Sequence, residues 1–229
     1  MNRGSAPSCR AAWLALALLV PAPSLGVLAG MYLAPGITSR VLFLICKAWV
    51  LLLPALWWLL VEKQRPSWSP LRRGGLLIGA TSGVAIAAAI LTTFFVVRPW
   101  ISPGPLLEAA HGMALDSPTA YLWAAAGWIG VNSLLEEYVY RWFILTRCEV
   151  LMPPAAAVAA SALIFTLHHV LALRVYLGPG LTALASLGVF LGGATWSWCY
   201  ARYRSIWPGW LSHILADAAV FWIGWRLLF

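Results

Sequence analysis

Long apolar stretches separated by short polar breaks make up most of the chain. Crossing the hydrocarbon core of a bilayer takes about 20 apolar residues, and stretches of that length recur from one end of the sequence to the other. Proline, glycine and charged residues gather in the breaks between them, where helices end. The pattern predicts an all-α fold, a polytopic membrane helical bundle of about seven transmembrane helices at residues 11–34, 41–61, 74–97, 121–147, 154–176, 181–201 and 208–228.

The segment 101–120, between the third and fourth predicted helices, does not fit this pattern. It holds His111 and two acidic residues among apolar ones and is too polar to cross a bilayer. We expect an exposed or interfacial loop, and we interpret His111 as a loop residue rather than as part of a catalytic site. The loop divides a single membrane domain into an N-terminal part, residues 1–120, and a C-terminal core, residues 121–229.

Composition supports the membrane class. Of the 229 residues, 62% are hydrophobic and 10% are charged. A formal net charge of +8 would favour a nucleic-acid partner in a soluble protein, but here the basic residues lie mostly between the apolar stretches, where they set the orientation of a membrane protein. We therefore predict an integral membrane protein that contacts the lipid bilayer and binds no nucleic acid.

The distribution of lysine and arginine predicts the orientation, because cytoplasmic loops carry the excess of basic residues. With a cytoplasmic N-terminus, nine basic residues lie on the cytoplasmic side and four on the other side, which favours this orientation. The nine are Arg3, Arg10, Lys63, Arg65, Arg72, Arg73, Arg147, Arg202 and Arg204, and the four are Arg40, Arg98, Arg174 and Arg226. The apolar residues after Arg10 continue past Pro21 and Pro23, so we expect a retained first helix rather than a cleaved signal peptide.

One predicted helix, 121–147, concentrates charge at Glu136, Glu137 and Arg141. A charged side chain at the centre of a membrane helix costs roughly 2.5 to 3.5 kcal/mol, so such residues usually face the interior of a bundle and serve a function. On an α-helix Glu137 and Arg141 share a face, whereas Glu136 lies about 100° further round. We expect Arg141 to pair with one carboxylate and the other carboxylate to face a cavity. A purely structural ion pair that fixes helix register is the alternative.

Two further predicted helices carry pairs of motif residues. Phe165 and His169 lie four residues apart, as do His213 and Asp217, so each pair shares a helix face. A lone histidine on an apolar face is more often a hydrogen-bonded core residue than a catalyst. However, ionisable groups on three separate membrane helices would together cost on the order of 10 kcal/mol if they stayed unpaired. We expect them to converge on one another or on water.

The three motifs resemble those of the CPBP intramembrane proteases, also called the Abi or CAAX-protease group, which include the eukaryotic Ras-converting enzyme. Members of this family carry EExxxR, FxxxH and HxxxN or HxxxD in that order, and the present chain keeps all three spacings within about residues 121–220. It departs from the family at Trp142, where many bacterial members have glycine. It also departs at His168, which is an additional imidazole, and at Asp217, which replaces the asparagine of the prenyl-protein enzymes.

The resemblance implies an intramembrane endopeptidase, in the inner (plasma) membrane of a bacterium, that hydrolyses a peptide bond of a membrane-associated protein or peptide. It implies six catalytic residues: Glu136, Glu137, Arg141, His169, His213 and Asp217. Glu136 would be the general base that activates a water molecule, and His169 would hold the same water. Glu137, held by Arg141, would support the site.

His213 and Asp217 would stabilise the oxyanion or orient the substrate carbonyl. We expect Asp217 to accept the second ring proton of His213 and so to fix its tautomer. The chain has no HExxH motif, and the resemblance leaves a metal cofactor open. A divalent ion such as Zn²⁺ would take Glu136, His169 and His213 as its ligands.

Two other classes of function stay open. A non-catalytic membrane scaffold or immunity protein would use the same cavity for binding, although the complete set of motif residues favours an enzyme. A proton-coupled transporter also buries Glu and His residues, but the sequence shows no internal repeat of the kind common among transporters. The sequence does not select among prenylated proteins, bacteriocin precursors and C-terminal sorting tags as substrates.

Overall fold

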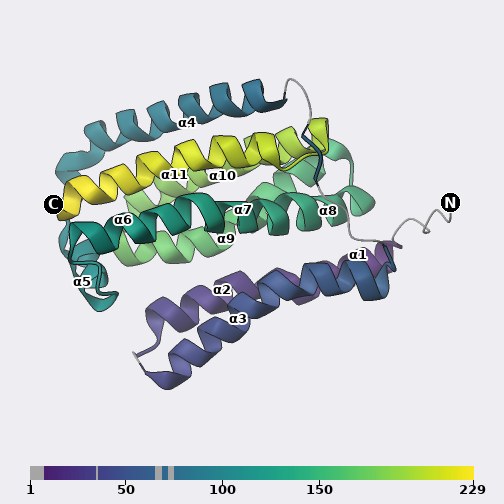
Figure 1. The fold of residues 1–229 in the computed structure, drawn as a ribbon, viewed down its shortest axis with the longest axis horizontal. Helices are drawn as coiled ribbons and strands as arrows, with labels where there is room; N and C mark the ends of the chain where they lie inside the picture. Colours follow the sequence, from purple (N-terminus) through teal and green to yellow (C-terminus); the bar gives the residue numbers. More distant parts are fainter. Residues whose placement is uncertain (1–7, 35, 65–68, 72–74) are drawn as a thin grey trace.

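The computed structural model describes residues 8–34, 36–64, 69–71 and 75–229, and all the regular elements in these ranges are helices. The chain begins with two antiparallel helical segments that lie side by side (Figure 1). The first segment consists of α1 (Cys9–Leu19), α2 (Pro21–Val27) and the π-helix η1 (Leu28–Tyr32). The second segment consists of α3 (Ile37–Leu56) and the π-helix η2 (Trp57–Val61).

The remaining helices form a second, larger group, which begins with α4 (Gly75–Val97), the short 3₁₀-helix η3 (Arg98–Trp100) and α5 (Gly104–Gly112). A continuous helical run follows and consists of α6 (Pro118–Gly127), η4 (Trp128–Asn132), α7 (Ser133–Glu136), η5 (Glu137–Leu145) and α8 (Thr146–Leu151). Two of its segments, η4 and η5, are π-helices. The chain ends with α9 (Pro154–Tyr176), α10 (Pro179–Tyr203) and α11 (Trp207–Leu228).

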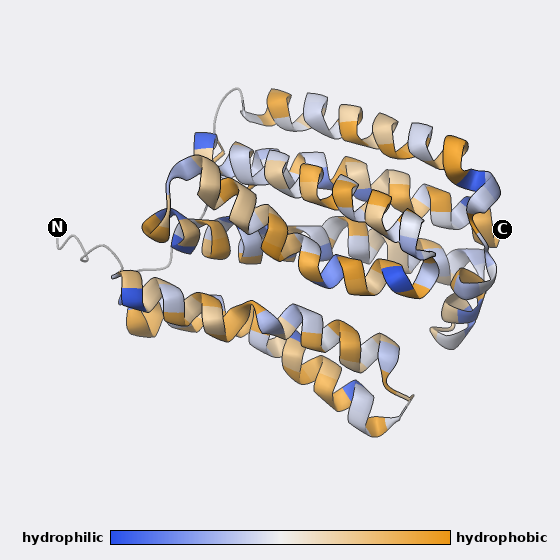
Figure 2. Ribbon diagram, turned by 180° about the vertical axis from the view of Figure 1, so that it is seen from behind, coloured by the Kyte–Doolittle hydropathy of each residue, from blue (hydrophilic) through white to orange (hydrophobic). Residues whose placement is uncertain are grey.

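Six helical segments in the described ranges are long and apolar enough to cross a membrane. They are Cys9–Tyr32, Ile37–Val61, Gly75–Trp100, Pro154–Tyr176, Pro179–Tyr203 and Trp207–Leu228. The predicted polytopic all-α bundle is therefore confirmed, and apolar residues run along the length of the helices in Figure 2. The predicted helix 121–147 lies inside the continuous run but is not among the six, because its charged and polar residues lower its hydropathy. The predicted start of the third helix, residue 74, lies outside the described residues.

The prediction of a loop over residues 101–120 was partly wrong, because Gly104 to Gly112 form helix α5. Proline in the first turn of a helix loses no hydrogen bond, and the leucines and alanines that follow favour helix formation. His111 lies in this helix, 84% exposed, with Nδ1 3.0 Å from Asp116 Oδ2. Figure 1 places α5 at the end of the bundle where the chain terminates.

Three glycines allow α4 to lie directly against the backbone of α11. Gly75, Gly79 and Gly83 are buried and four residues apart, so they form one stripe along α4. A Cβ at Gly79 would overlap the backbone of Pro208, and one at Gly83 would overlap that of Ser212. Small residues permit this kind of close approach between membrane helices. The contact fixes the first turns of α11, which precede the motif histidine at position 213.

We expect a methyl group added at Gly79 to destabilise the bundle, because the space beside it is filled by α11 backbone. Overpacking of this kind costs about 1 to 3 kcal/mol. Thermal unfolding in detergent should therefore give Gly79→Ala a lower melting temperature than the wild type. Gly188→Ala on α10 is the control, since a Cβ there meets no described atom within 4 Å. Equal melting temperatures for the two variants would contradict the packing described here.

Candidate active site

The first motif lies where the backbone changes from an α-helix to a π-helix. Glu136 is the last residue of α7, and Glu137 is the first residue of η5. π-helical turns are wider than α-helical ones and occur often at functional sites. Arg141 is still within reach of Glu137, with 3.4 Å between Nε and Oε1, and both side chains are fully buried. The predicted ion pair is therefore present, although the helix that carries it is not an α-helix.

Glu137 also contacts the histidine of the third motif. Its Oε1 lies 3.1 Å from His213 Nδ1. An ionised carboxylate paired with Arg141 only accepts hydrogen bonds, so His213 Nδ1 carries the hydrogen. We predicted Asp217 as the acceptor that fixes this tautomer. The structure places Asp217 Oδ1 3.7 Å from the other ring nitrogen, Nε2, and gives the acceptor position to Glu137.

Aromatic rings surround Arg141 and His213. The guanidinium carbon of Arg141 lies 4.6 Å from the centre of the Phe165 ring and 5.3 Å from that of Trp196. Trp196 also stacks on His213, with ring centres 3.8 Å apart. No hydrogen bond to the Arg141 guanidinium occurs within the described residues. The ion pair with Glu137 and the faces of the rings therefore hold this charge in the interior.

Glu136 differs from its neighbour because it reaches a less enclosed part of the bundle. Its side chain is 19% exposed, whereas that of Glu137 is not exposed at all. Glu136 Oε2 lies 3.6 Å from His213 Nε2. Its other oxygen, Oε1, accepts a hydrogen bond of 2.9 Å from Asn132 Nδ2. One carboxylate oxygen is thus tethered, and the other faces an imidazole.

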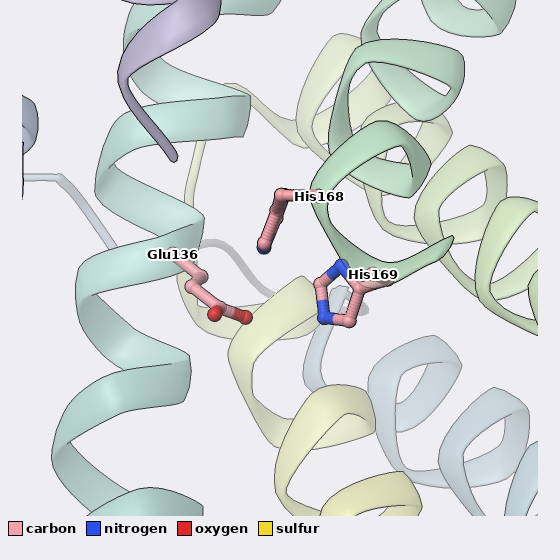
Figure 3. A group of neighbouring side chains, drawn as sticks. All are labelled: Glu136, His168 and His169. Carbon is pink, nitrogen blue, oxygen red and sulfur yellow. The ribbon is translucent and has the colours of Figure 1, made fainter. Parts of the chain in front are cut away.

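Two histidines of α9 face the same carboxylate, as Figure 3 shows. His169 Nδ1 lies 2.9 Å from the carbonyl oxygen of Phe165, which can only accept, so Nδ1 donates and Nε2 keeps its lone pair. His168 Nδ1 lies 3.1 Å from the hydroxyl of Tyr140. Glu136, His168 and His169 each offer a ligand atom within 4.8 Å of the others. One carboxylate and two imidazoles are a donor set that suits Zn²⁺.

All six residues of the predicted site belong to one connected group of contacts. Glu137 contacts Arg141 and His213, and His213 Nε2 in turn lies close to Glu136 and Asp217. His169 joins the group through its proximity to Glu136. Within the described residues, the candidate metal ligands include His168 rather than His213, in contrast to the predicted set of Glu136, His169 and His213.

Two residues of this neighbourhood were missed in the sequence. Asn132 lies four residues before Glu136, on the same face of the helical run. Lys47 donates a hydrogen bond of 2.8 Å from Nζ to Asn132 Oδ1. The signal that could have identified Lys47 is that it is a single lysine within the apolar stretch 41–61, where a cation needs a polar partner.

Comparison with known protein families supports the resemblance to CAAX proteases. Residues 118–219 match the family described as type II CAAX prenyl endopeptidase Rce1-like. This part of the chain is therefore similar to the Rce1-like family. The three motifs lie inside the matched residues, whereas α1 to α5 precede them. A comparison with curated proteins and one with solved structures each gave no match. The match supports a CAAX-protease-like intramembrane endopeptidase that acts on membrane-associated substrates.

Removing one member of the Glu137–Arg141 pair should strongly destabilise the bundle. Glu137→Gln and Arg141→Met each leave a buried charge without its partner, which costs about 3 to 5 kcal/mol. The double variant removes both charges, so its loss should be smaller than the sum of the two single losses. Thermal unfolding in detergent measures all three.

Glu149→Gln is the control for this experiment. Its ion pair with Arg204 is partly exposed, with side-chain exposures of 18% and 53%. Exposed pairs contribute about 1 kcal/mol or less. Single variants of Glu137 and Arg141 that unfold no more readily than Glu149→Gln would show that the buried pair does not stabilise the bundle.

Proposed function

We propose that the chain hydrolyses a peptide bond of a membrane-associated protein or peptide, with Glu136 as the general base that activates water. The observation that carries the proposal is the difference between the two adjacent glutamates. Glu137 is fully buried and engaged by Arg141 and His213. Glu136 is partly exposed and has one oxygen free of hydrogen bonds within the described residues. A general base must be reachable by water and able to take its proton, and the partial exposure and unbonded oxygen of Glu136 support this role.

The proposed reaction uses the side chains around Glu136 in turn. A water molecule gives a proton to the Glu136 carboxylate and a hydrogen bond to the Nε2 lone pair of His169. Its oxygen attacks the carbonyl carbon of the substrate. Glu136 then passes the proton to the leaving nitrogen as the C–N bond breaks. His213 in its doubly protonated form donates from Nε2 to the oxyanion, and Asp217 lies 3.7 Å from the same nitrogen.

We further propose that the protein resides in the inner membrane of a bacterium with its N-terminus in the cytoplasm. Arg147 and Arg204 support this orientation, since α8 and the end of α10 lie at the same end of the bundle as the start of α1 (Figure 1). Basic residues are more frequent on the cytoplasmic side of membrane proteins. The substrate would be a prenylated protein, a bacteriocin precursor or a C-terminal sorting tag.

A metal-dependent peptidase is the second candidate, and the Glu136–His168–His169 group favours it. These residues fit a divalent ion, which would supply Lewis-acid activation of water when bound. Tyr140 and the Phe165 carbonyl orient the two imidazoles, as outer-shell partners of metal ligands do. His213 is less suited as a ligand, because Glu137 binds its Nδ1 and Trp196 covers its ring.

Glu136→Gln should abolish proteolysis while the protein stays folded, because an amide keeps the shape of the side chain but cannot take a proton. An internally quenched, farnesylated peptide with a CAAX terminus is a suitable probe, with the protein in lipid vesicles. General-base removal lowers kcat by about 10²- to 10⁴-fold. Glu108→Gln, at an exposed position of α5, is the control and should retain activity. Wild-type turnover in Glu136→Gln would rule out this base. A non-catalytic scaffold would give no turnover in any variant.

Chelation separates the two mechanisms. We expect turnover of the same probe to survive a membrane-permeant chelator, with the purified protein containing far less than one zinc per chain by elemental analysis. The metal-dependent candidate requires the opposite result: about one ion per chain, lost in His168→Ala but kept in the control His111→Ala, since a metal site of three protein ligands depends on each of them. About one zinc ion per chain that is lost in His168→Ala would therefore favour the metal-dependent mechanism over general-base catalysis without a metal.

A further inference from the structure

We propose that Lys47 and Asn132 are positioning residues for Glu136, and that the N-terminal helices thereby contribute to the active site. The inference rests on the proposed role of Glu136 as the base. Lys47 belongs to α3, far from the glutamate in sequence and outside the residues matched by the Rce1-like family. Asn132 is the last residue of the π-helix η4.

The three side chains form a chain of two hydrogen bonds. Lys47 Nζ donates to Asn132 Oδ1 at 2.8 Å, and Asn132 Nδ2 donates to Glu136 Oε1 at 2.9 Å. An ammonium group has only donors, so the amide must turn its oxygen toward Lys47. The amide nitrogen then points to Glu136. Lys47 therefore fixes the orientation of the amide, and the amide fixes one oxygen of the carboxylate.

This arrangement positions Glu136 without a direct ion pair. No contact of 4.0 Å or less joins Lys47 to Glu136 within the described residues. The ammonium group acts through the amide, so Lys47 holds the carboxylate without covering it. Its second oxygen, Oε2, is the one that faces His213 at 3.6 Å. The tether thus selects which oxygen is available to water.

Packing around η4 supports a positioning role. The side chain of Trp210, on α11, donates from Nε1 to the carbonyl oxygen of Gly130 at 3.1 Å. The hydroxyl of Ser133 donates to the carbonyl oxygen of Ile129. Both bonds engage carbonyls of the π-helical turn, where the regular pattern of backbone hydrogen bonds is disturbed. Asn132 therefore projects from a backbone that α11 holds in place.

The location of Lys47 also indicates a function. The lysine lies within the candidate span Ile37–Val61, where most of its neighbours in sequence are apolar. A cation in such a segment is costly to insert, and intramembrane ionisable residues usually have a functional partner. Its partner here is the amide that holds the proposed base.

Steady-state kinetics with the farnesylated CAAX peptide test the positioning role. We expect Lys47→Met and Asn132→Ala each to lower kcat by about 10- to 100-fold, as misplacement of a catalytic group does, with KM changed by less than about twofold because substrate contacts are kept. Lys47→Arg keeps a donor and should recover most of the loss. Lys63→Met, at the other lysine of the chain, is the matched control and should behave as the wild type.

A double-mutant cycle decides whether the two residues act through one another. If Lys47 works through Asn132, the double variant should be no slower than Asn132→Ala alone, because the lysine has lost its route to the carboxylate. Losses in kcat that multiply, or a Lys47→Met variant with wild-type kcat, would overturn the proposal.

A measurement that needs no activity separates this inference from the proposed function. Hydrophobic carbodiimides modify membrane-embedded carboxyl groups, and mass spectrometry gives the rate at Glu136. A carboxylate released from its tether should be modified severalfold faster in Lys47→Met and Asn132→Ala, but not in Lys63→Met. If the two variants show this change but the wild type does not cleave the peptide, cleavage of this CAAX substrate is refuted and the tether is retained. Unchanged modification rates would refute the tether itself.

Discussion

The arrangement of this site depends on the need to compensate the charge of one buried carboxylate. Glu137 has no exposed surface, and its oxygen Oε1 meets both Arg141 and His213. The contact with His213 joins η5 to α11, whereas Arg141 lies within η5 itself. The guanidinium then requires the rings of Phe165 and Trp196, which come from α9 and α10. A single desolvated charge therefore determines how four helical segments pack, because any of them that moved away would leave a polar group unpaired in an apolar interior.

The presence of two consecutive glutamates allows one of them to be structural and the other to remain reactive. Successive residues of a helix point in different directions, so Glu137 lies inside the ion pair while Glu136 reaches His168 and His169. In the proposed mechanism, water and a substrate would reach the partly exposed carboxylate without disturbing the buried one. The environment, rather than the identity of the side chain, separates their proposed roles.

The sequence predicted the membrane class and six candidate site residues that the structure places close together, because long apolar stretches and four-residue spacings report which side chains share a helix face. It could not predict which helix faces approach one another. The acceptor for His213 is therefore Glu137, from another helix, rather than the nearby Asp217. The Lys47–Asn132 contact joins residues 85 positions apart and has no periodic signal. Helix α5 was missed for a local reason, since polar residues obscured a short helix with proline in its first turn.

The π-helix η5 makes the length of this segment as important as its composition. A deletion of one residue beyond Arg141 that left the π-helical geometry of η5 in place would shift every later residue by one position along the helix. Everything after the deletion would turn by about 100° about the helix axis. Arg147, which pairs with Glu62 at 2.5 Å, would then point elsewhere. Such a chain would retain every motif residue and every motif spacing, yet α8 would no longer face its partners. A gap in this stretch of a sequence alignment therefore indicates a structural change that the motif residues alone do not reveal.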